Sequence, residues 1–175
     1  MLPEVQHSEI VYRGRAFVVR RDRVRFPNGH SSELDIVDHP GAVTLVPIDR
    51  GQVCMVRQYR HSAGQVLLEL PAGTLEPGED PRACAARECR EEIGMAPARL
   101  VPIGEAFLAP GYSTEYMYFY LATELSPAPL DADLDEDLAL ERVPIRAIPE
   151  RIASGELRDA KSLAALFLAR EWLED

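Results

Sequence analysis

The chain has 175 residues, of which 46% are hydrophobic and 27% charged, and its formal net charge is −10 at pH 7. This length and composition predict a single domain over residues 1–175, and the negative charge argues against binding the backbone of a nucleic acid. No segment is apolar over a length that would span a membrane, and the N-terminus lacks the apolar run of a signal peptide. We therefore expect a cytoplasmic protein that contacts neither nucleic acid nor membrane.

The first part of the chain reads as a series of β-strands separated by turns. Residues 42–48 are almost all apolar, which is typical of a buried central strand. Asn28-Gly29 marks a turn between two strands. The predicted strands are Glu9–Tyr12, Phe17–Arg25, Glu33–Asp38, Ala42–Ile48, Gln52–Gln58 and Val66–Leu70.

The next segment predicts a helix whose two ends are marked in the sequence. Asp80 suits the N-cap and Pro81 the first helical position. Gly94 suits the left-handed residue that ends a helix, and the residues between are rich in the helix formers Ala, Arg and Glu.

The same helix is predicted to have two unlike faces. At about 100° per residue, Glu88, Glu91 and Glu92 share one side. The opposite side, expected to be the buried one, carries Ala86, Cys89 and Ile93. The helix would thus present carboxylates on one side and anchor itself on the other.

The remaining elements complete an α/β or α+β pattern around an acidic loop at residues 126–137. Predicted strands are Leu100–Leu108, Tyr116–Ala122 and Leu140–Ile145, and predicted helices are Pro149–Ser154 and Ala160–Leu173. The cysteines have no metal-ligand spacing and read as reduced core residues: Cys54, Cys84 and Cys89.

The densest chemical signal lies between Gly73 and Met95, GTLEPGEDPRACAARECREEIGM. Carboxylates this close together repel one another unless cations lie among them, and hard oxygen ligands suit Mg²⁺ or Mn²⁺. The segment resembles the Nudix box, G-x5-E-x7-R-E-U-x-E-E-x-G-U, in which U is a bulky apolar residue. The fixed positions all match: Gly73, Glu79, Arg87, Glu88, Glu91, Glu92 and Gly94. Cys89 is a small substitute at the first U position.

The resemblance implies the Nudix fold, a mixed β-sheet between α-helices, here with an antiparallel region of N-terminal strands. Residues 41–175 would form the core of the domain. Residues 1–40 would form these strands, which members of the branch named below often exchange between the subunits of a homodimer.

The flanks of the box are similar to the ADP-ribose pyrophosphatase branch of the Nudix family. The similarity rests on the stretches 56–60, 68–73 and 109–112, and on Glu115. In that branch a proline about fifteen residues after the box accompanies ADP-ribose specificity, and here Pro110 follows Met95 by 15 (110 − 95).

The resemblance also implies roles for individual residues. The main-chain carbonyl of Ala72, Glu88 and Glu92 would hold two or more Mg²⁺ (or Mn²⁺) ions, with Glu91 assisting. Gly73 would let the backbone turn sharply beside the ions, and Arg87 would pair with Glu79 and hold the loop to the helix.

Substrate contacts are expected from residues outside the box. The guanidinium of Arg60 can grip a phosphate or form a salt bridge. Asp35 and Glu115 match positions near a ribose or a metal-bound water, and Arg15 lies where the adenine would be held.

The catalytic base has two candidates in the sequence. Glu136 best fits the late loop glutamate proposed for this branch, but Leu138 stands where relatives often carry a second carboxylate. The alternative is a glutamate of the helix itself, Glu91 or Glu92.

The resemblance therefore predicts a Mg²⁺-dependent hydrolase that cleaves ADP-ribose to AMP and ribose 5-phosphate. One alternative is a pyrophosphatase for another nucleoside diphosphate sugar or a dinucleotide. A second, from another class, is a Nudix domain that senses a ligand without catalysis. An intact box disfavours the sensor, since that alternative predicts a degraded one.

Overall fold

The computed structural model describes residues 1–131 and 137–173. These residues form two compact units. The first consists of Met1–Gly41 and Ala106–Met117, and the second of Ala42–Glu105 and Tyr118–Asp175. The expectation of a single domain over residues 1–175 stays a prediction.

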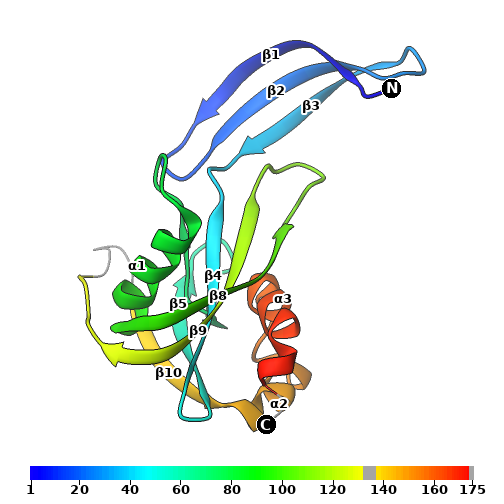
Figure 1. Ribbon diagram of the computed structural model, residues 1–175. Coiled ribbons are helices and arrows are strands. Elements are labelled where there is room, and N and C mark those ends of the chain that lie inside the picture. The colour runs from blue at the N-terminus through cyan, green and yellow to red at the C-terminus, as the bar shows by residue number, and fades with distance from the viewer. Residues whose placement is uncertain (132–136, 174–175) are drawn as a thin grey trace. The chain divides into compact units, whose positions relative to one another are not determined.

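The first unit is built on an antiparallel sheet of three strands, in the order β1-β2-β3 (Figure 1). The strands are β1 (Glu4–Arg13), β2 (Val18–Arg25) and β3 (Ser31–Asp38). Gly29, with φ of 84°, allows the turn between β2 and β3. The predicted antiparallel region of N-terminal strands is confirmed.

The second segment of this unit forms a turn that bonds to the end of β3. The N–H of Val37 donates to the carbonyl of Tyr112 at 2.7 Å, and the N–H of Thr114 donates to the carbonyl of Val37 at 2.9 Å. The rings of Phe107 and Tyr116 pack edge to face, with centroids 4.7 Å apart. This segment is therefore held by main-chain bonds as well as by ring packing.

The second unit contains a larger sheet in the order β10-β5-β4-β9-β8, with β6 added on β5 and β7 on β4. The nearly all-apolar β4 is central and buried, as the sequence predicts. The strands are β4 (Ala42–Asp49), β5 (Gln52–Arg60), β6 (Gln65–Glu69), β7 (Ala72–Thr74), β8 (Met95–Phe107), β9 (Tyr116–Pro127) and β10 (Leu138–Pro144).

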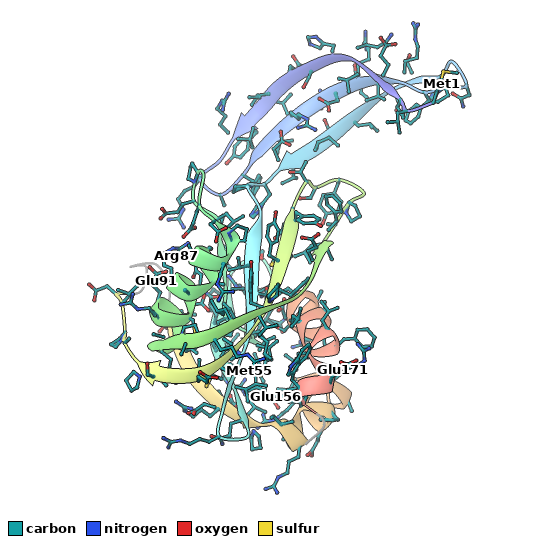
Figure 2. The ribbon with its side chains drawn as sticks, viewed as in Figure 1. Met1, Met55, Arg87, Glu91, Glu156 and Glu171 are labelled. Atoms are coloured by element: carbon teal, nitrogen blue, oxygen red, sulfur yellow. The ribbon has the colours of Figure 1, made fainter. Side chains whose placement is uncertain are left out.

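Helices lie on both sides of this sheet, with α1 on one side and α3 on the other (Figure 1). Figure 2 shows Met55, which is fully buried, inside this unit, whereas Arg87 and Glu91 stand on α1. The helices are α1 (Pro81–Ile93), α2 (Ile148–Ala153) and α3 (Ala160–Leu168), with short 3₁₀ turns at Ile145–Ala147 and Arg170–Trp172. The predicted fold class, α+β with a sheet between helices, is confirmed.

The core between α1 and the sheet combines alternate residues of β4 with the apolar side of the helix. Val43 and Leu45 of β4 pack in one cluster with Cys84, Ala85 and Cys89 of α1. The alternation of side chains along a strand turns Thr44 and Val46, both fully buried, to the other side of the sheet.

Several element boundaries differ from the sequence prediction, among them the start of β8 and the end of the last helix, and the short strand β7 was not predicted. β8 begins at Met95 and not at Leu100, because an edge strand tolerates a proline such as Pro97, which would argue against a central strand. The last helix ends at Leu168, and the chain continues as a 3₁₀ turn at Arg170–Trp172. No helix in residues 1–131 and 137–173 has the length and apolarity needed to cross a membrane.

Candidate active site

The short strand β7 carries the beginning of the box and is fixed to the centre of the sheet. Ala72 and Gly73 pair with Thr44 and Val43 of β4. Just before it, the carbonyl of Pro71 accepts a hydrogen bond from the N–H of Leu45 at 2.9 Å. The main chain at Ala72 and Gly73 is therefore held in place by β4.

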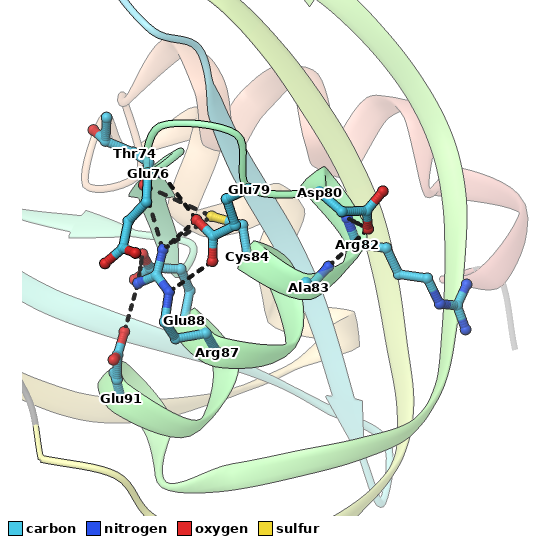
Figure 3. A network of polar contacts seen from close by, with 10 residues as sticks. All are labelled: Thr74, Glu76, Glu79, Asp80, Arg82, Ala83, Cys84, Arg87, Glu88 and Glu91. Carbon is cyan, nitrogen blue, oxygen red and sulfur yellow. Dashed lines mark hydrogen bonds and ion pairs between the residues drawn. The ribbon is translucent and has the colours of Figure 1, made fainter.

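The two ends of α1 form as the sequence predicts. One carboxylate oxygen of Asp80 accepts hydrogen bonds from the N–H groups of Arg82 at 3.0 Å and Ala83 at 3.1 Å (Figure 3). Gly94 adopts φ of 70°, and its N–H donates to the carbonyl of Cys89. These local caps set the helix limits and hence the positions of the carboxylates along it.

Arg87 stands at the centre of the acidic residues of the box (Figure 3). It donates through Nε and Nη2 to the two carboxylate oxygens of Glu79, both at 2.9 Å. Its Nη1 donates to Glu88 at 2.6 Å and to Glu91 at 2.8 Å. Arg87 thus ties the loop to the helix through Glu79, as expected, and also holds two further carboxylates.

This pairing changes the acidity of Glu79. The hydrogen bonds from Arg87 lower the pKa of Glu79 to about 2, against a smaller opposing effect of burial. The N–H of Glu76 also donates to Glu79 at 3.0 Å. Glu79 therefore stays ionised at neutral pH and serves as an anchor for Arg87.

Gly73 lies against the carboxylate of Glu88. A Cβ built on Gly73 would be 1.8 Å from Oε1 of Glu88, far inside contact distance. The φ of Gly73 is not among the left-handed values found at other glycines of the chain. The sequence suggested that glycine allows a sharp turn here, but the structure shows that glycine leaves room for Glu88.

Two carboxylates of α1 are less exposed than we expected from a helix with one acidic side and one buried side. Glu88 and Glu92 are buried, with 7% and 8% of their surface exposed. The N–H of Ala72 donates to Oε2 of Glu92 at 3.1 Å, so this side of the helix packs on β7. Cys89 and Ile93 are buried as expected, whereas Ala86 is only partly buried.

The donor set suits a hard divalent cation. Glu88 and Glu92 are buried carboxylates beside the strand that carries the main-chain carbonyl of Ala72, and such oxygens are the ligands that Mg²⁺ and Mn²⁺ prefer. Within the part of the chain that the structure describes, no group of three or more His, Cys, Asp or Glu side chains forms a complete metal-binding site. Main-chain, substrate or water oxygens would have to complete the coordination.

Arg60, expected to bind a phosphate, is held by a buried carboxylate. It donates through Nε to Oε1 of Glu69 at 2.9 Å and through Nη2 to Oε2 at 2.7 Å. The hydrogen bonds of Glu69 raise the pKa of Arg60, and the negative charge of Glu92 adds to this effect. Arg60 therefore stays charged and lies within electrostatic range of the box.

Four other predicted residues belong to the first unit. Asp35 accepts a hydrogen bond from Nε of Arg21 at 2.8 Å, and Arg15 lies between β1 and β2. Pro110 sits in a turn in which the N–H of Tyr112 donates to Ala109 at 3.1 Å. The N–H of Glu115 donates to Ser113 at 3.1 Å. Glu136, the candidate base, lies outside the described residues.

The sequence reading missed a polar cluster behind Arg60. Lys161 and Ser162 at the start of α3, with the N-cap Asp159, contact Glu69 and the main chain of Leu70. The only signal in the sequence was a run of polar residues before an apolar helix, which is also typical of an ordinary capped helix.

Comparisons with known proteins agree with this geometry. The NUDIX domain family matches residues 38–166. The chain is 35% identical to the ADP-ribose pyrophosphatase of Bacillus subtilis (strain 168), over 91% of this chain and 88% of that protein. It is 38% identical to the ADP-ribose pyrophosphatase of Mycobacterium tuberculosis (strain ATCC 25618 / H37Rv), over 93% and 81%. A crystal structure of an ADP compounds hydrolase superposes with a TM-score of 0.89 at 28% identity, covering 99% of this chain and 95% of the other.

Proposed function

The chain belongs to the Nudix family of hydrolases, and we propose that it hydrolyses the pyrophosphate bond of ADP-ribose to give AMP and ribose 5-phosphate. The observation that carries this proposal is the packing of the buried carboxylates Glu88 and Glu92 around β7, with Arg87 fixing the loop to the helix. The names of the two relatives support ADP-ribose as the substrate.

The reaction adds water across a phosphoanhydride. The water oxygen forms a bond to one phosphorus, the bridging P–O bond breaks, and the proton of the water passes to a base. The Ala72 carbonyl, Glu88 and Glu92 would hold two or more Mg²⁺ or Mn²⁺ ions, with Glu91 assisting, and the chemistry so supplied is charge neutralisation and activation of water.

The residues of the chain itself would orient the diphosphate. Arg60 presents a guanidinium, which makes forked contacts with phosphate oxygens. Arg87 would not contact the diphosphate itself, because its donors are directed at Glu79, Glu88 and Glu91. We assign it a structural role in keeping the carboxylates in place.

The proton acceptor is proposed to be Glu136, with Glu91 or Glu92 as the alternative. Glu91 is paired with Arg87 at 2.8 Å and Glu92 with the N–H of Ala72 at 3.1 Å. Each of these two carboxylates is thus already held by a donor of the box. This engagement favours Glu136 as the proposed base.

Selection of the ADP-ribose moiety is proposed to involve the four residues of the first unit. Pro110 would mark the specificity turn, Arg15 would contact the adenine, and Asp35 and Glu115 would lie near a ribose or the attacking water. Another nucleoside diphosphate sugar or a dinucleotide would use the same box with different contacts at these positions.

A homodimer formed through residues 1–40 is part of the proposal. β1 lies at the edge of its sheet, and all ten of its residues are exposed. An edge strand of this kind can pair with another chain. Sedimentation velocity would test this, since a fully active monomer would reject the dimer. The cytoplasmic location stays a prediction.

A panel of compounds tests the proposed reaction: ADP-ribose, ADP-glucose, GDP-mannose, NADH and diadenosine polyphosphates, each with Mg²⁺ and with EDTA. Metal-dependent preference for ADP-ribose is the expected result. Metal-dependent preference for another compound would support the proposed chemistry and reject ADP-ribose as the substrate. Binding of ADP-ribose without turnover would favour a ligand sensor.

A further inference from the structure

We propose that Lys161 is a positioning residue that keeps the positive charge of Arg60 available to an anionic substrate. The proposal rests on the function proposed above and extends the active site to the start of α3. Lys161 is 101 positions after Arg60 in the chain (161 − 60), so this role is not visible in the sequence.

The carboxylate of Glu69 is shared between two cations. Its side chain is only 1% exposed, and its two oxygens accept hydrogen bonds from Nε and Nη2 of Arg60. Lys161 Nζ contacts Oε2 of the same carboxylate and also donates to Asp159 at 2.8 Å. Burial raises the pKa of Glu69, but the hydrogen bonds and positive charges of Arg60 and Lys161 together outweigh it, and the pKa is lowered.

Exposure shows which member of this cluster can reach a substrate. The side chain of Arg60 is 37% exposed, whereas that of Lys161 is 13% exposed and that of Glu69 is 1% exposed. A guanidinium has five N–H groups, and the fork on Glu69 uses two of them. Arg60 is therefore the member that can bind phosphate, and Lys161 lies behind it.

The charge balance explains why a second cation is needed. Asp159, Glu69 and Glu92 all act on Arg60 through their negative charges. Without Lys161, the group of Arg60, Glu69 and Asp159 would carry a net charge of −1 (one cation, two anions). A phosphate approaching Arg60 would then meet repulsion, which is poorly screened at partly buried groups. With Lys161 the group of Arg60, Glu69 and Asp159 becomes neutral, so a phosphate that approaches Arg60 meets one negative charge fewer.

The start of α3 is anchored so that Lys161 cannot move away. Asp159 caps the helix and accepts from the N–H of Ser162 at 3.0 Å and its hydroxyl at 2.6 Å. The same hydroxyl oxygen accepts from the N–H of Leu70 at 2.7 Å. Leu70 lies two residues before Ala72, so the helix start is bonded to the loop that leads into the box.

Substitution of Lys161 tests this role in the full-length protein. Lys161→Met removes the charge and the hydrogen bonds, Lys161→Gln removes the charge but keeps a donor, and Lys161→Arg keeps the charge. Arg99→Met is the matched control, because it removes one positive charge from an exposed site on the edge strand β8.

Binding is measured without turnover, with the α,β-methylene analogue of ADP-ribose and with ADP, by isothermal titration calorimetry in EDTA. Lys161→Gln and Lys161→Met should weaken both ligands by about tenfold. KM for ADP-ribose should rise by a similar factor while kcat changes much less, and Lys161→Arg should restore most of the affinity. The control should bind as the wild type does.

Two outcomes would overturn the role of Lys161. The first is wild-type affinity in Lys161→Gln, the variant chosen because it retains a donor to Glu69 and so disturbs folding least. The second is a lower melting temperature in Lys161→Met with unchanged affinity, which would indicate a structural role alone. Failure of the wild type to cleave ADP-ribose would count against the proposed function, and the ADP measurements would still report on Lys161.

Discussion

The carboxylate of Glu88 occupies the space in which a side chain on Gly73 would begin. A Cβ at residue 73 would lie 1.8 Å from Oε1 and 1.9 Å from Cδ of Glu88. The main chain of Gly73 cannot easily move away from Glu88, because its neighbours Ala72 and Thr74 are also paired with β4. The first glycine of the box is thus a requirement for close approach between the strand and the helix.

Gly73→Ala should reduce kcat/KM by at least about 100-fold, since Glu88 must leave its place, and overpacking should cost about 1–3 kcal/mol of unfolding free energy. Steady-state kinetics and urea unfolding measure the two effects. In a Glu88→Ala background the same substitution should cost little stability, because the clashing carboxylate is gone. An equal cost in both backgrounds would contradict the contact.

Glu88→Gln and Glu92→Gln should each lower turnover by orders of magnitude with the fold intact. The amide keeps the size of the side chain but loses the charge needed to hold a divalent cation. Turnover with Mg²⁺ and circular dichroism check the expectation, with Glu171→Gln as an exposed control. Rates near those of the wild type for both variants would reject the metal assignment.

Glu136→Gln should lower turnover and leave metal affinity largely unchanged if this residue accepts the proton. Turnover across a pH series and Mn²⁺ titration followed by electron paramagnetic resonance separate the two properties. A rate equal to that of the wild type would return the role of base to Glu91 or Glu92.

The ion pair between Glu79 and Arg87 should make stability depend on pH in the acid range. Arg87 lowers the pKa of Glu79 from 4.5 to about 2. A carboxyl whose pKa is depressed by folding stabilises the native state above its unfolded pKa, and this contribution is lost as pH falls from 4.5 towards 2. At neutral pH, Glu79→Gln should therefore be less stable than the wild type by about 1–3 kcal/mol. The difference, measured by urea unfolding at several pH values, should shrink as the pH approaches 2; a constant difference would contradict the ion pair.

The cysteine thiols should be unreactive in the folded protein. Cys54, Cys84 and Cys89 are all fully buried, and burial raises the pKa of Cys89 to about 12. Thiolates are the reactive form, so Ellman's reagent at pH 8 should modify none of them before unfolding and all of them in guanidinium chloride. Rapid modification of the native protein would show that this core opens readily.

The sequence identified the helix of the box and its ends, because caps act through residues that are adjacent along the chain. Asp80, Pro81 and Gly94 have the expected positions in the structure. The pair of Arg87 with Glu79 was also expected from the resemblance, since the motif fixes their spacing and Glu79 directly precedes the N-cap of the helix that carries Arg87.

The burial of Glu88 and Glu92 could not be read from the sequence. Helical periodicity separates the faces of a helix but does not say what packs against each one. Here β7, held on β4, covers the side that carries the carboxylates. The start of β8 was missed for a related reason, because prolines argue against a strand unless its position at a sheet edge is known.

The family resemblance, the residues of the box and the helix that carries most of them could be recognised in the amino-acid sequence, because all three depend on local spacing. The contact between Gly73 and Glu88, and the sharing of Glu69 between Lys161 and Arg60, became visible in the folded structure alone. These contacts join β7 to α1, and β5 and β6 to α3, which lies far from both strands along the chain. They exist because the pairing and packing of the sheet bring those elements together.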